Sequence, residues 1–426
     1  MKYIKTISRT PLFKATSLNS ASILLKIAIG IVTSKVLAVF VGPGGMALVG
    51  NLRNFLTATE TASTLGFQNG IVKYIVEHKN DKKQLQKIIS TVFITLLAVT
   101  ILLSTILFTF SAFWSYLIFG ENYQYATIFK VLAIVLPWYA TTVFLIAVVN
   151  GMGKYGNVIR INIVGNMIGL VFSIIMIWKF NTLGALLSII IPPSLLFFVV
   201  FYFINKDIRF FETISVTSFD FKILKKLSSY SMMTLVSSLC GPLVFLAIRN
   251  NVIVTLDIAQ AGFWEAMTRI STYYLMFISS ILSIYFFPKL AFSNSQKATR
   301  NVFKSYYRSI FPLFVIGLFF IYFLRFYIIH LLFTPAFLPV TKLFFWQLLG
   351  DVFKAASMIL GYQFFAKKLT VAFILTEVFS LIMMYCFSHY FIISFGIQGV
   401  VMAHALTYFI YLAVLLLYFR KSIVTQ

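Results

Sequence analysis

Residues 88–113 read IISTVFITLLAVTILLSTILFTFSAF and contain no charged side chain. A helix of about 20 apolar residues is long enough to cross the hydrocarbon core of a bilayer. Lipid offers no hydrogen-bond partners, so a single segment crosses it as a helix, which satisfies its own backbone groups. The stretch is preceded directly by Lys82, Lys83 and Lys87, and basic residues commonly flank transmembrane segments. The stretch therefore predicts a transmembrane helix.

The same apolar character extends over the whole chain of 426 residues, of which 60% are hydrophobic and 11% are charged. An average soluble domain has about 25% charged residues. This composition excludes an ordinary soluble enzyme, a disulfide scaffold and a disordered chain. The first apolar window is too long for a signal peptide and lacks a small-residue cleavage site. Twelve windows could cross a membrane: residues 17–41, 46–67, 88–113, 125–149, 157–178, 183–204, 227–249, 258–287, 305–330, 337–365, 370–391 and 396–419.

The distribution of basic residues among the loops predicts the orientation of the chain. If residue 1 is cytoplasmic, most of the 35 Lys and Arg residues fall in inside segments such as 73–87 and 289–308. The opposite turns, such as 42–45 and 394–399, are short and nearly uncharged. Cytoplasmic loops of membrane proteins are enriched in Lys and Arg. We therefore expect both termini in the cytoplasm, and the net charge of +24 does not require a nucleic-acid partner.

A weak internal repeat divides the chain into two halves. Phe180 and Gly184 recur as Phe395 and Gly399 at an offset of 215 residues, and other matches lie close to this offset. An even number of spans in each half gives a parallel repeat with its axis along the membrane normal. The predicted fold is an all-α membrane protein with twelve transmembrane helices in two six-helix bundles, related by a pseudo-two-fold axis around a central cavity. The predicted domains are residues 1–204, a cytoplasmic linker over 205–226, and residues 227–426.

Ionisable residues occur inside several of the apolar windows. Each costs about 2.5–3.5 kcal/mol near the centre of a membrane, so each requires a partner or a function. Lys26 lies on a polar helix face with Asn19, whereas Lys35 points to the opposite face and could instead reach the membrane surface. Glu265 and Arg269 could form a same-helix ion pair. The basic candidates for substrate binding are Lys26, Lys35, Arg53, Arg249, Arg269 and Lys354, and the acidic candidates for ion coupling are Glu60, Asp351 and Glu377.

The balance of these charges favours an anionic substrate. The basic candidates outnumber the acids of the same windows, and a positive cavity of low dielectric attracts anions. Arg binds phosphate through its planar fork and Lys as a point charge. Glu377 has no basic neighbour one turn away, so it is a candidate for binding H⁺ or Na⁺. The chain has no Walker A sequence and no metal-ligand spacing among its four His and two Cys residues, so we expect no enzyme, metal or other cofactor.

Three stretches carry a resemblance to a known family. They are KVLAVFVGPGGMALVGNLR at residues 35–53, FQNGIVKY at 67–74 and WQLLGDVFK at 346–354. These resemble the Wzx-type polysaccharide flippases, and the last stretch is closest to their lipid III branch. In one departure from that branch, Thr272 is neutral where some members carry an acid, which puts ion coupling through that helix in doubt. The resemblance implies substrate or coupling roles for Lys26, Lys35, Arg53, Arg249, Asn250, Asp351, Lys354 and Glu377.

The resemblance also implies a function and partners. Members of the multidrug/oligosaccharidyl-lipid/polysaccharide exporter superfamily of this type carry undecaprenyl-diphosphate-linked oligosaccharides from the cytoplasmic to the periplasmic leaflet. The substrate is then lipid III or an O-antigen or capsule repeat unit, and the location is the bacterial inner membrane. We expect a monomer in membrane lipid, with other glycan-assembly membrane proteins as candidate partners. The alternatives are a multidrug or cation antiporter of the same superfamily and, from another class, a membrane glycan polymerase or ligase.

Overall fold

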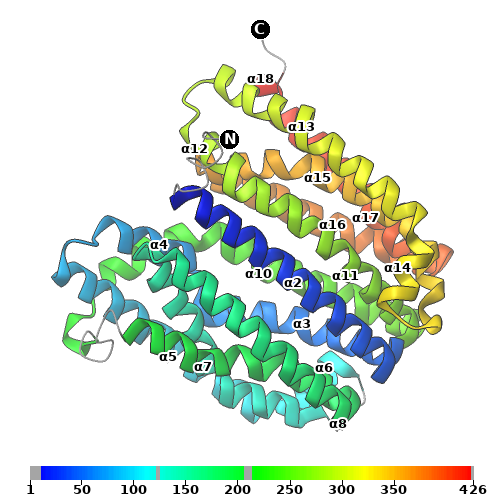
Figure 1. Cartoon of the computed structure of the whole chain (residues 1–426), viewed down its shortest axis with the longest axis horizontal. Coiled ribbons are helices and arrows are strands. Elements are labelled where there is room, and N and C mark those ends of the chain that lie inside the picture. Colours follow the sequence, from blue (N-terminus) through cyan, green and yellow to red (C-terminus); the bar gives the residue numbers. More distant parts are fainter. Residues whose placement is uncertain (1–10, 121–124, 206–213, 424–426) are drawn as a thin grey trace, which may run out of the picture. The chain divides into compact units, whose positions relative to one another are not determined.

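The computed structural model describes residues 11–120, 125–205 and 214–423, and these form a nearly all-helical protein (Figure 1). The first ten residues and residues 206–213 of the predicted linker lie outside the described residues. The chain divides into two compact units, which are described one at a time. Unit 1 comprises Met1–Val36 and Asn51–Leu239, and unit 2 comprises Leu37–Gly50 and Cys240–Gln426. The predicted limits of two membrane bundles, 1–204 and 227–426, remain a prediction.

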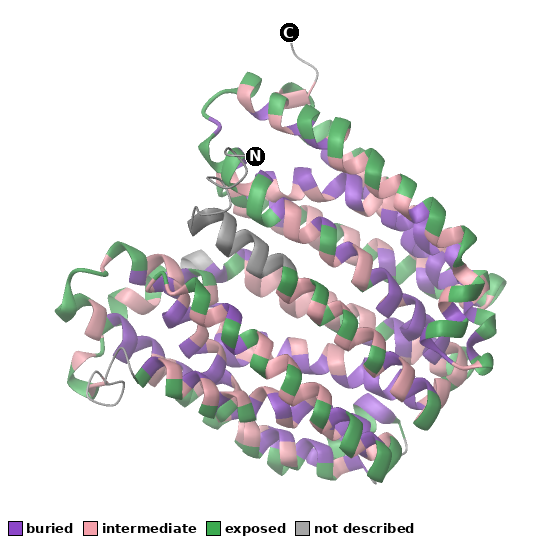
Figure 2. Cartoon of the chain, viewed as in Figure 1, coloured by how far each residue is buried: buried purple, intermediate pink, exposed green. Residues whose placement is uncertain are grey.

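Unit 1 is built around a core where five helices meet. Phe67, Ile71, Ile89, Phe144 and Leu145 are almost completely buried in this core, and Figure 2 shows buried positions recurring along the helices. Long, mostly apolar runs explain why the long segments are helical. Unit 1 contains most of α2 (Pro11–Phe40) and α3 (Gly42–Thr64), then α4 (Gln68–Glu77), α5 (Lys82–Thr109), α6 (Ser111–Phe119), α7 (Ala126–Gly151), α8 (Tyr155–Asn205), η2 (Val216–Ser218) and the first part of α10 (Phe221–Thr255).

Unit 2 holds the candidate residues of the second half of the chain. It also includes Leu37–Gly50, which is the turn between α2 and α3 with the helix ends beside it. Within this unit α15 packs against α13 and α17, and α16 packs against α17. After the end of α10 come α11 (Ile258–Ile281), the π-helical turn η3 (Leu282–Phe286), α12 (Phe287–Phe292), α13 (Gln296–Phe323), α14 (Arg325–Leu332), η4 (Pro335–Leu343), α15 (Phe344–Lys367), α16 (Thr370–Phe395), α17 (Ile397–Tyr418) and α18 (Arg420–Ile423).

Polar side chains cap several helices at their first turn. The Asp81 carboxylate accepts backbone hydrogen bonds from Lys83 and Gln84 at the start of α5, both at 3.1 Å. Asp257 accepts from the backbone N–H of Gln260 at the start of α11, at 2.7 Å. Such caps satisfy N–H groups that have no partner within the helix. The acids outside the apolar windows therefore fix where two of the long helices begin.

Ten helices of the described part of the chain are long and apolar enough to cross a membrane. The predicted window 46–67 corresponds to α3, which is long but too polar to be among the ten. Two predicted windows, 157–178 and 183–204, fall in α8, whose helical path is broken at Asn181 with φ 46° and ψ −123°. The exact count of twelve spans therefore stays a prediction. The chain is nevertheless a multi-pass, all-α membrane protein.

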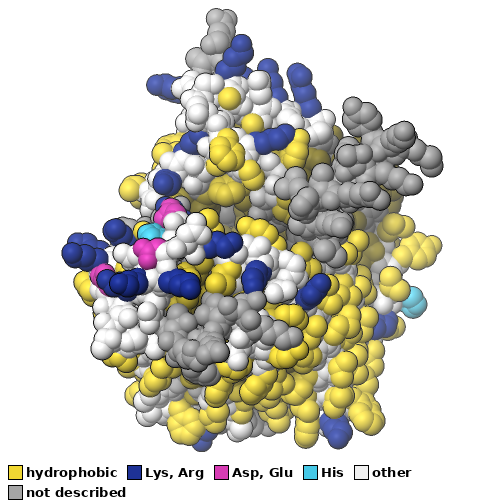
Figure 3. Space-filling view, turned by 60° about the vertical axis from the view of Figure 1, so that its left-hand side comes forward, with side chains coloured by type: hydrophobic (Ala, Val, Ile, Leu, Met, Phe, Trp, Pro, Cys, Tyr) yellow, Lys and Arg dark blue, Asp and Glu magenta, His cyan; other side chains and the backbone are white. Residues whose placement is uncertain are grey.

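The outer surface agrees with a lipid environment. Large apolar side chains point outward, for example Phe198, which is 63% exposed, and Leu313, which is 68% exposed. Figure 3 shows hydrophobic side chains over broad areas of the visible face. Soluble monomers rarely expose apolar patches larger than a few hundred Å². Lipid is the solvent that such a surface requires.

The internal repeat has a counterpart in backbone geometry. Asn181 interrupts α8 with φ 46° and ψ −123°, and Gly396, 215 residues later, joins α16 to α17 with φ 57° and ψ −141°. After each turn a glycine, Gly184 or Gly399, packs directly against a backbone carbonyl of the preceding helix, Met176 or Phe391. A side chain larger than hydrogen would not fit there. The sequence match at these positions thus reflects the same tight turn between two helices.

Candidate functional site

The first buried charged cluster of unit 2 joins α10 and α11. Arg249 donates from Nη2 to Oε2 of Glu265 at 2.8 Å, and Arg269 donates from Nε to Oε1 of the same acid at 3.0 Å. The three residues are 1%, 3% and 5% exposed, respectively. The Arg249 guanidinium also lies 5.0 Å from the ring centre of Trp264. The predicted same-helix pair of Glu265 and Arg269 is therefore present, and a second arginine from another helix completes it.

Two features show how tightly this cluster is built. A Cβ atom at Gly50 would overlap the Glu265 carboxylate and lie 2.9 Å from Cζ of Arg249, so the α3 backbone approaches the ion pairs directly. With two guanidinium groups and one carboxylate, the cluster carries one excess positive charge. The Nη2 atom of Arg269 is buried without a hydrogen-bond acceptor among the described residues. The cluster is thus a buried set of ion pairs in which Nη2 of Arg269 can still donate a hydrogen bond to an anion.

The second cluster of unit 2 surrounds Asp351 on α15, which is completely buried. Its Oδ2 atom accepts hydrogen bonds from Ser271 Oγ at 2.7 Å, from Gln347 Nε2 at 3.2 Å and from the Tyr274 hydroxyl. Its Oδ1 atom lies 3.0 Å from Nε2 of His404 on α17. Lys354 lies three residues after Asp351 on the same helix, but the two form no ion pair in the described part of the chain. Asp351 instead connects three helices: α11, α15 and α17.

Lys354 continues this polar region toward α16. Its ammonium group lies 5.1 Å from the ring centre of Tyr408 on α17, and that ring packs at 4.8 Å against the imidazole of His404. Glu377 on α16 lies within electrostatic reach of Lys354. The sequence pattern places Glu377 without a basic neighbour on its own helix. In the folded unit, Lys354 on α15 is the basic neighbour of Glu377. Asp351, Lys354 and Glu377, which were predicted separately, therefore belong to one polar region.

Unit 1 holds a smaller cluster around Glu60 on α3. Tyr139 on α7 donates to Oε2 of Glu60 at 2.5 Å, and Gln68 at the start of α4 donates to Oε1 at 3.5 Å. Both partners are neutral, in contrast to the charged partners of Glu265. All three side chains are half-buried. Glu60 is therefore partly accessible, and the two side chains that donate to it carry no charge.

The remaining predicted site residues are distributed between the two units. In unit 1, Lys26 is exposed on α2, and Lys35 and Arg53 are half-buried on α2 and α3. In unit 2, Asn250 is half-buried one residue after the closed cluster of Arg249. Across the described residues, no group of three His, Cys, Asp or Glu side chains is placed to hold a metal ion.

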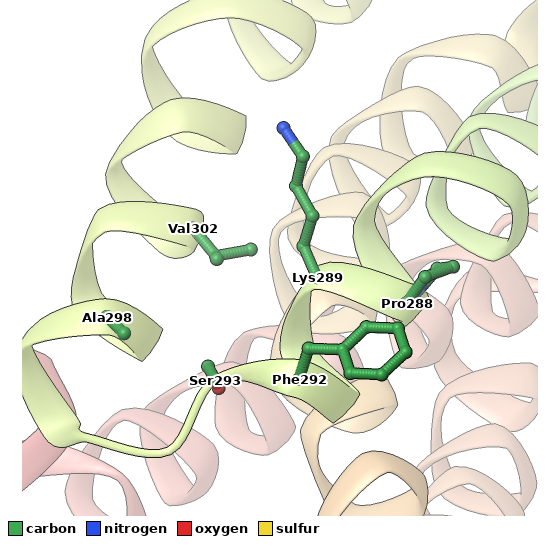
Figure 4. A pocket seen from close by; sticks show the side chains of 6 residues that line it. All are labelled: Pro288, Lys289, Phe292, Ser293, Ala298 and Val302. Atoms are coloured by element: carbon green, nitrogen blue, oxygen red, sulfur yellow. The ribbon is translucent and has the colours of Figure 1, made fainter.

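A cavity of about 380 Å³ lies elsewhere in unit 2, between α12 and the start of α13 (Figure 4). Lys289 is its only charged lining residue, and its ammonium group lies 3.7 Å from the ring centre of Tyr285. None of the predicted site residues lines this cavity. Its lining residues are Pro288, Lys289, Phe292, Ser293, Ala298 and Val302.

Sequence reasoning missed the neutral and histidine partners of the acids. His404 is the only acidic or basic residue within α17, so its position in an apolar helix was an available signal. Tyr139 and Tyr274 gave no comparable signal, because tyrosine is common in membrane helices for other reasons. In the sequence, Tyr139 is 79 residues from Glu60, and Tyr274 is 77 residues from Asp351.

The architecture defines a class of protein. It is similar to the inward-facing conformation of a multidrug resistance MATE family transporter of the MOP superfamily, with a TM-score of 0.77 and 15% identity over 94% of each chain. A MOP superfamily transporter from Pyrococcus furiosus, described by the reverse polarity of its binding pocket, has a TM-score of 0.72 and 14% identity, covering 97% of this chain and 96% of that one. The fold is therefore that of MATE-type transporters.

The sequence comparison is more specific. The chain belongs to the polysaccharide biosynthesis protein family, whose model matches residues 36–342. It is 29% identical over 417 residues to the lipid III flippase of Escherichia coli (strain K12), and equally to that of Shigella flexneri. Each alignment covers 96% of this chain and 100% of the relative.

Proposed function

We propose that the protein is a flippase that moves an undecaprenyl-diphosphate-linked oligosaccharide from the cytoplasmic to the periplasmic leaflet of the bacterial inner membrane. The observation that carries this proposal is the similarity to lipid III flippases along their entire length. The MATE-type transporter fold supports it, because this fold serves transport across a membrane. The substrate class includes lipid III and the repeat units of O-antigen or capsule.

The charges within the membrane helices support a phosphorylated substrate. The six basic candidates outnumber the four acids of these helices, and two of the six are already engaged by Glu265. A diphosphate requires cationic partners, since an unpaired anion is costly in a medium of low dielectric. Half-buried Arg53 and exposed Lys26 are the cations of unit 1 that we assign to the headgroup, with Lys35 as a further contact. In unit 2 we assign this role to Lys354 and Asn250, and to the unused donor of Arg269.

The transport cycle that we propose is alternating access driven by an ion. Rearrangement of the two halves exposes the substrate site to one leaflet and then to the other, while an acid such as Asp351, Glu377 or Glu60 exchanges H⁺ or Na⁺. In this proposal both termini lie in the cytoplasm, which the distribution of Lys and Arg supports. The protein acts as a monomer and catalyses no covalent step. Glycan-assembly proteins of the same membrane supply the substrate and consume the product.

A multidrug or cation antiporter is the second candidate, because solved multidrug transporters share the fold. Such a protein prefers lipophilic cations, which the positive balance of the membrane helices would repel. A glycan polymerase or ligase is a weaker alternative. It would require a catalytic group that acts on the glycan, whereas the relatives with full-length similarity are flippases.

Genetic complementation tests the proposed function. The chain should restore surface glycan to bacteria that lack their own lipid III flippase, without changing the length distribution of the glycan chains. Arg53→Ala should reduce this restoration by about tenfold to a hundredfold, since a charge-assisted hydrogen bond contributes about 1.5–3 kcal/mol. Lys342→Ala is the matched control, because Lys342 is exposed on η4 outside the assigned site. Normal membrane levels without any restored glycan would contradict the proposal.

A further inference from the structure

The cavity between α12 and α13 takes no part in the function proposed above. Its volume of about 380 Å³ lies within the range of about 300–1,000 Å³ that is usual for small-molecule sites. In Figure 4, Lys289 and Phe292 from α12 and Val302 from α13 frame this cavity. Its lining is apolar apart from Lys289 and Ser293. An apolar cavity with one cation suits a molecule that has an apolar body and a negatively charged group.

We propose that this cavity binds an anionic phospholipid of the surrounding membrane. Its acyl chain lies against Phe292 and Val302, and its phosphate group lies at the Lys289 ammonium group. The inference goes beyond the proposed function, because this phospholipid is a resident of the membrane and is not the transported glycolipid. Its binding does not depend on whether the protein is a flippase.

The connection between α12 and α13 is fixed by hydrogen bonds, so the cavity is present before a ligand binds. The backbone carbonyl of Ser293 accepts a hydrogen bond from Nζ of Lys367 at the end of α15, and the Ser293 hydroxyl lies 2.9 Å from that of Thr299. Further along α13, the Tyr306 hydroxyl donates to the carbonyl of Ala355 on α15 at 2.8 Å. A preformed site binds more tightly, because little order has to be created on binding.

Lys289 can donate to a phosphate group. Its ammonium group lies 3.7 Å from the ring centre of Tyr285, and no acid forms an ion pair with it in the described part of the chain. Glu265 and Asp351, the nearest acids before and after it in the sequence, are buried among their own partners. An ammonium group has three N–H donors. A phosphate oxygen can therefore accept from Lys289 while the ring contact remains.

The start of α13 lies at the depth of lipid headgroups. The helix has 28 residues and is about 42 Å long, whereas the hydrocarbon core of a bilayer is about 30 Å thick. Residues 309–323 carry no charge, so the end with Ala298 and Val302 is the one that reaches the headgroups. Phe292 is 83% exposed, and an exposed aromatic ring near a lysine is typical of a membrane interface. In the orientation proposed above, this is the cytoplasmic leaflet.

A row of basic residues gives this part of unit 2 a positive potential. Four cations recur on α13 at intervals of three or four residues and lie within about 80° of one another around the helix. They are Lys297, Arg300, Lys304 and Arg308. Residues 266–350 contain no Asp or Glu that could compensate them. The row faces a different side of α13 from Ala298 and Val302, so it attracts an anionic lipid through its field, whereas Lys289 makes the direct contact.

The test is lipid binding to the full-length protein in detergent, measured by native mass spectrometry. Phosphatidylglycerol and phosphatidylcholine with identical acyl chains serve as probes, since they differ in net charge. The protein should bind phosphatidylglycerol about tenfold more tightly, and Lys289→Gln should remove this preference. Lys304→Gln should weaken binding by about fivefold, because it changes only the field. Lys342→Gln is the matched control and should bind as the wild-type chain does, since Lys342 is exposed on η4 outside this site.

A second pair of measurements tests the apolar part of the site. Ala298→Trp places a large side chain in the cavity and should reduce the binding of both phospholipids. Glycerol phosphate, which is the headgroup without acyl chains, should not displace bound phosphatidylglycerol. If Ala298→Trp does not fold, thermal unfolding gives the same information, because a lipid that binds only the folded state raises the midpoint. Phosphatidylglycerol should then raise the midpoint of the wild-type chain more than that of Lys289→Gln.

The outcomes distinguish this inference from the proposed function. Equal binding of the two phospholipids, or undiminished binding of phosphatidylglycerol to Lys289→Gln, would overturn the lipid site. Displacement by glycerol phosphate alone would overturn it as well. None of these results affects translocation of a lipid-linked glycan, which is measured separately. A protein that binds phosphatidylglycerol as predicted but restores no surface glycan would support the lipid site and contradict the flippase proposal.

Discussion

The two compact units treat buried charge differently. In unit 1, Glu60 is half-buried and receives hydrogen bonds from the neutral side chains Tyr139 and Gln68. In unit 2, Glu265 is enclosed by two arginines. Asp351 accepts hydrogen bonds from three side chains and contacts a histidine. The comparison shows that one protein can keep one membrane acid, Glu60, partly accessible and bury two others, Glu265 and Asp351, among their partners. Each prediction below breaks or sharpens this contrast.

The largest effect is expected where unit 2 loses its shared acid. Glu265→Ala removes the buried carboxylate that Arg249 and Arg269 share and should destabilise the protein by about 3–5 kcal/mol. Equilibrium unfolding in detergent micelles measures this change. Glu77→Ala is the matched control, because the Lys73–Glu77 pair of unit 1 is exposed and contributes at most about 1 kcal/mol. Equal stability of the two variants would show that the buried cluster has no structural role.

The next effect follows from the close approach of α3 to that cluster. Gly50→Ala places a Cβ atom against Glu265 and Arg249 and should destabilise the protein by about 2–3 kcal/mol, as overpacking does. Gly317→Ala on α13 is its control, since nothing lies within 4 Å of a Cβ there. The control should be neutral or slightly stabilising, because alanine is the better helix former. The midpoints of thermal unfolding of both variants measure these changes. An unchanged midpoint for Gly50→Ala would refute the close contact between Gly50 and the Glu265 cluster.

Removal of one hydroxyl from each unit sharpens the contrast directly. Tyr139→Phe removes one of two donors from Glu60 and should destabilise the protein by about 1.5 kcal/mol. Tyr274→Phe removes one of three donors from Asp351, which also contacts His404, so its effect should be smaller, about 0.5–1 kcal/mol. Unfolding measurements of both variants under identical conditions give the ratio of their two losses in free energy of unfolding. A larger loss for Tyr274→Phe would reverse our view of which acid is better supported.

The smallest effect concerns the repeated turn. Asn181 adopts a positive φ of 46°, which glycine accommodates without a steric cost, as Gly396 does at the equivalent position. Asn181→Gly should therefore stabilise the protein by about 0.5–1 kcal/mol. Gly396→Ala should destabilise it by a larger amount. A rise in the midpoint of thermal unfolding for the first variant and a fall for the second would verify the repeat at the level of the backbone.

The sequence predicted the helices well, and it predicted one ion pair of the candidate site, Glu265–Arg269. Apolar windows such as 88–113 define helices because lipid permits no alternative, and α5 indeed covers Lys82–Thr109. The Glu265–Arg269 pair was predictable because both residues lie one turn apart on one helix. The partners Arg249 and His404 were not, because they come from other helices, 16 residues from Glu265 and 53 residues from Asp351. Only the packing of helices brings such partners together.

The most direct measurement of the central claim is translocation in vesicles of the purified protein. Undecaprenyl-diphosphate carrying a fluorescent oligosaccharide is placed in both leaflets, and a membrane-impermeant quencher reports the fraction that is accessible outside. The account predicts that the wild-type chain moves the lipid between leaflets, and that Lys354→Ala slows this movement by about tenfold or more while Lys342→Ala does not. Folded wild-type protein that leaves the labelled lipid in its original leaflet, while transporting a lipophilic cation such as ethidium, would contradict the account.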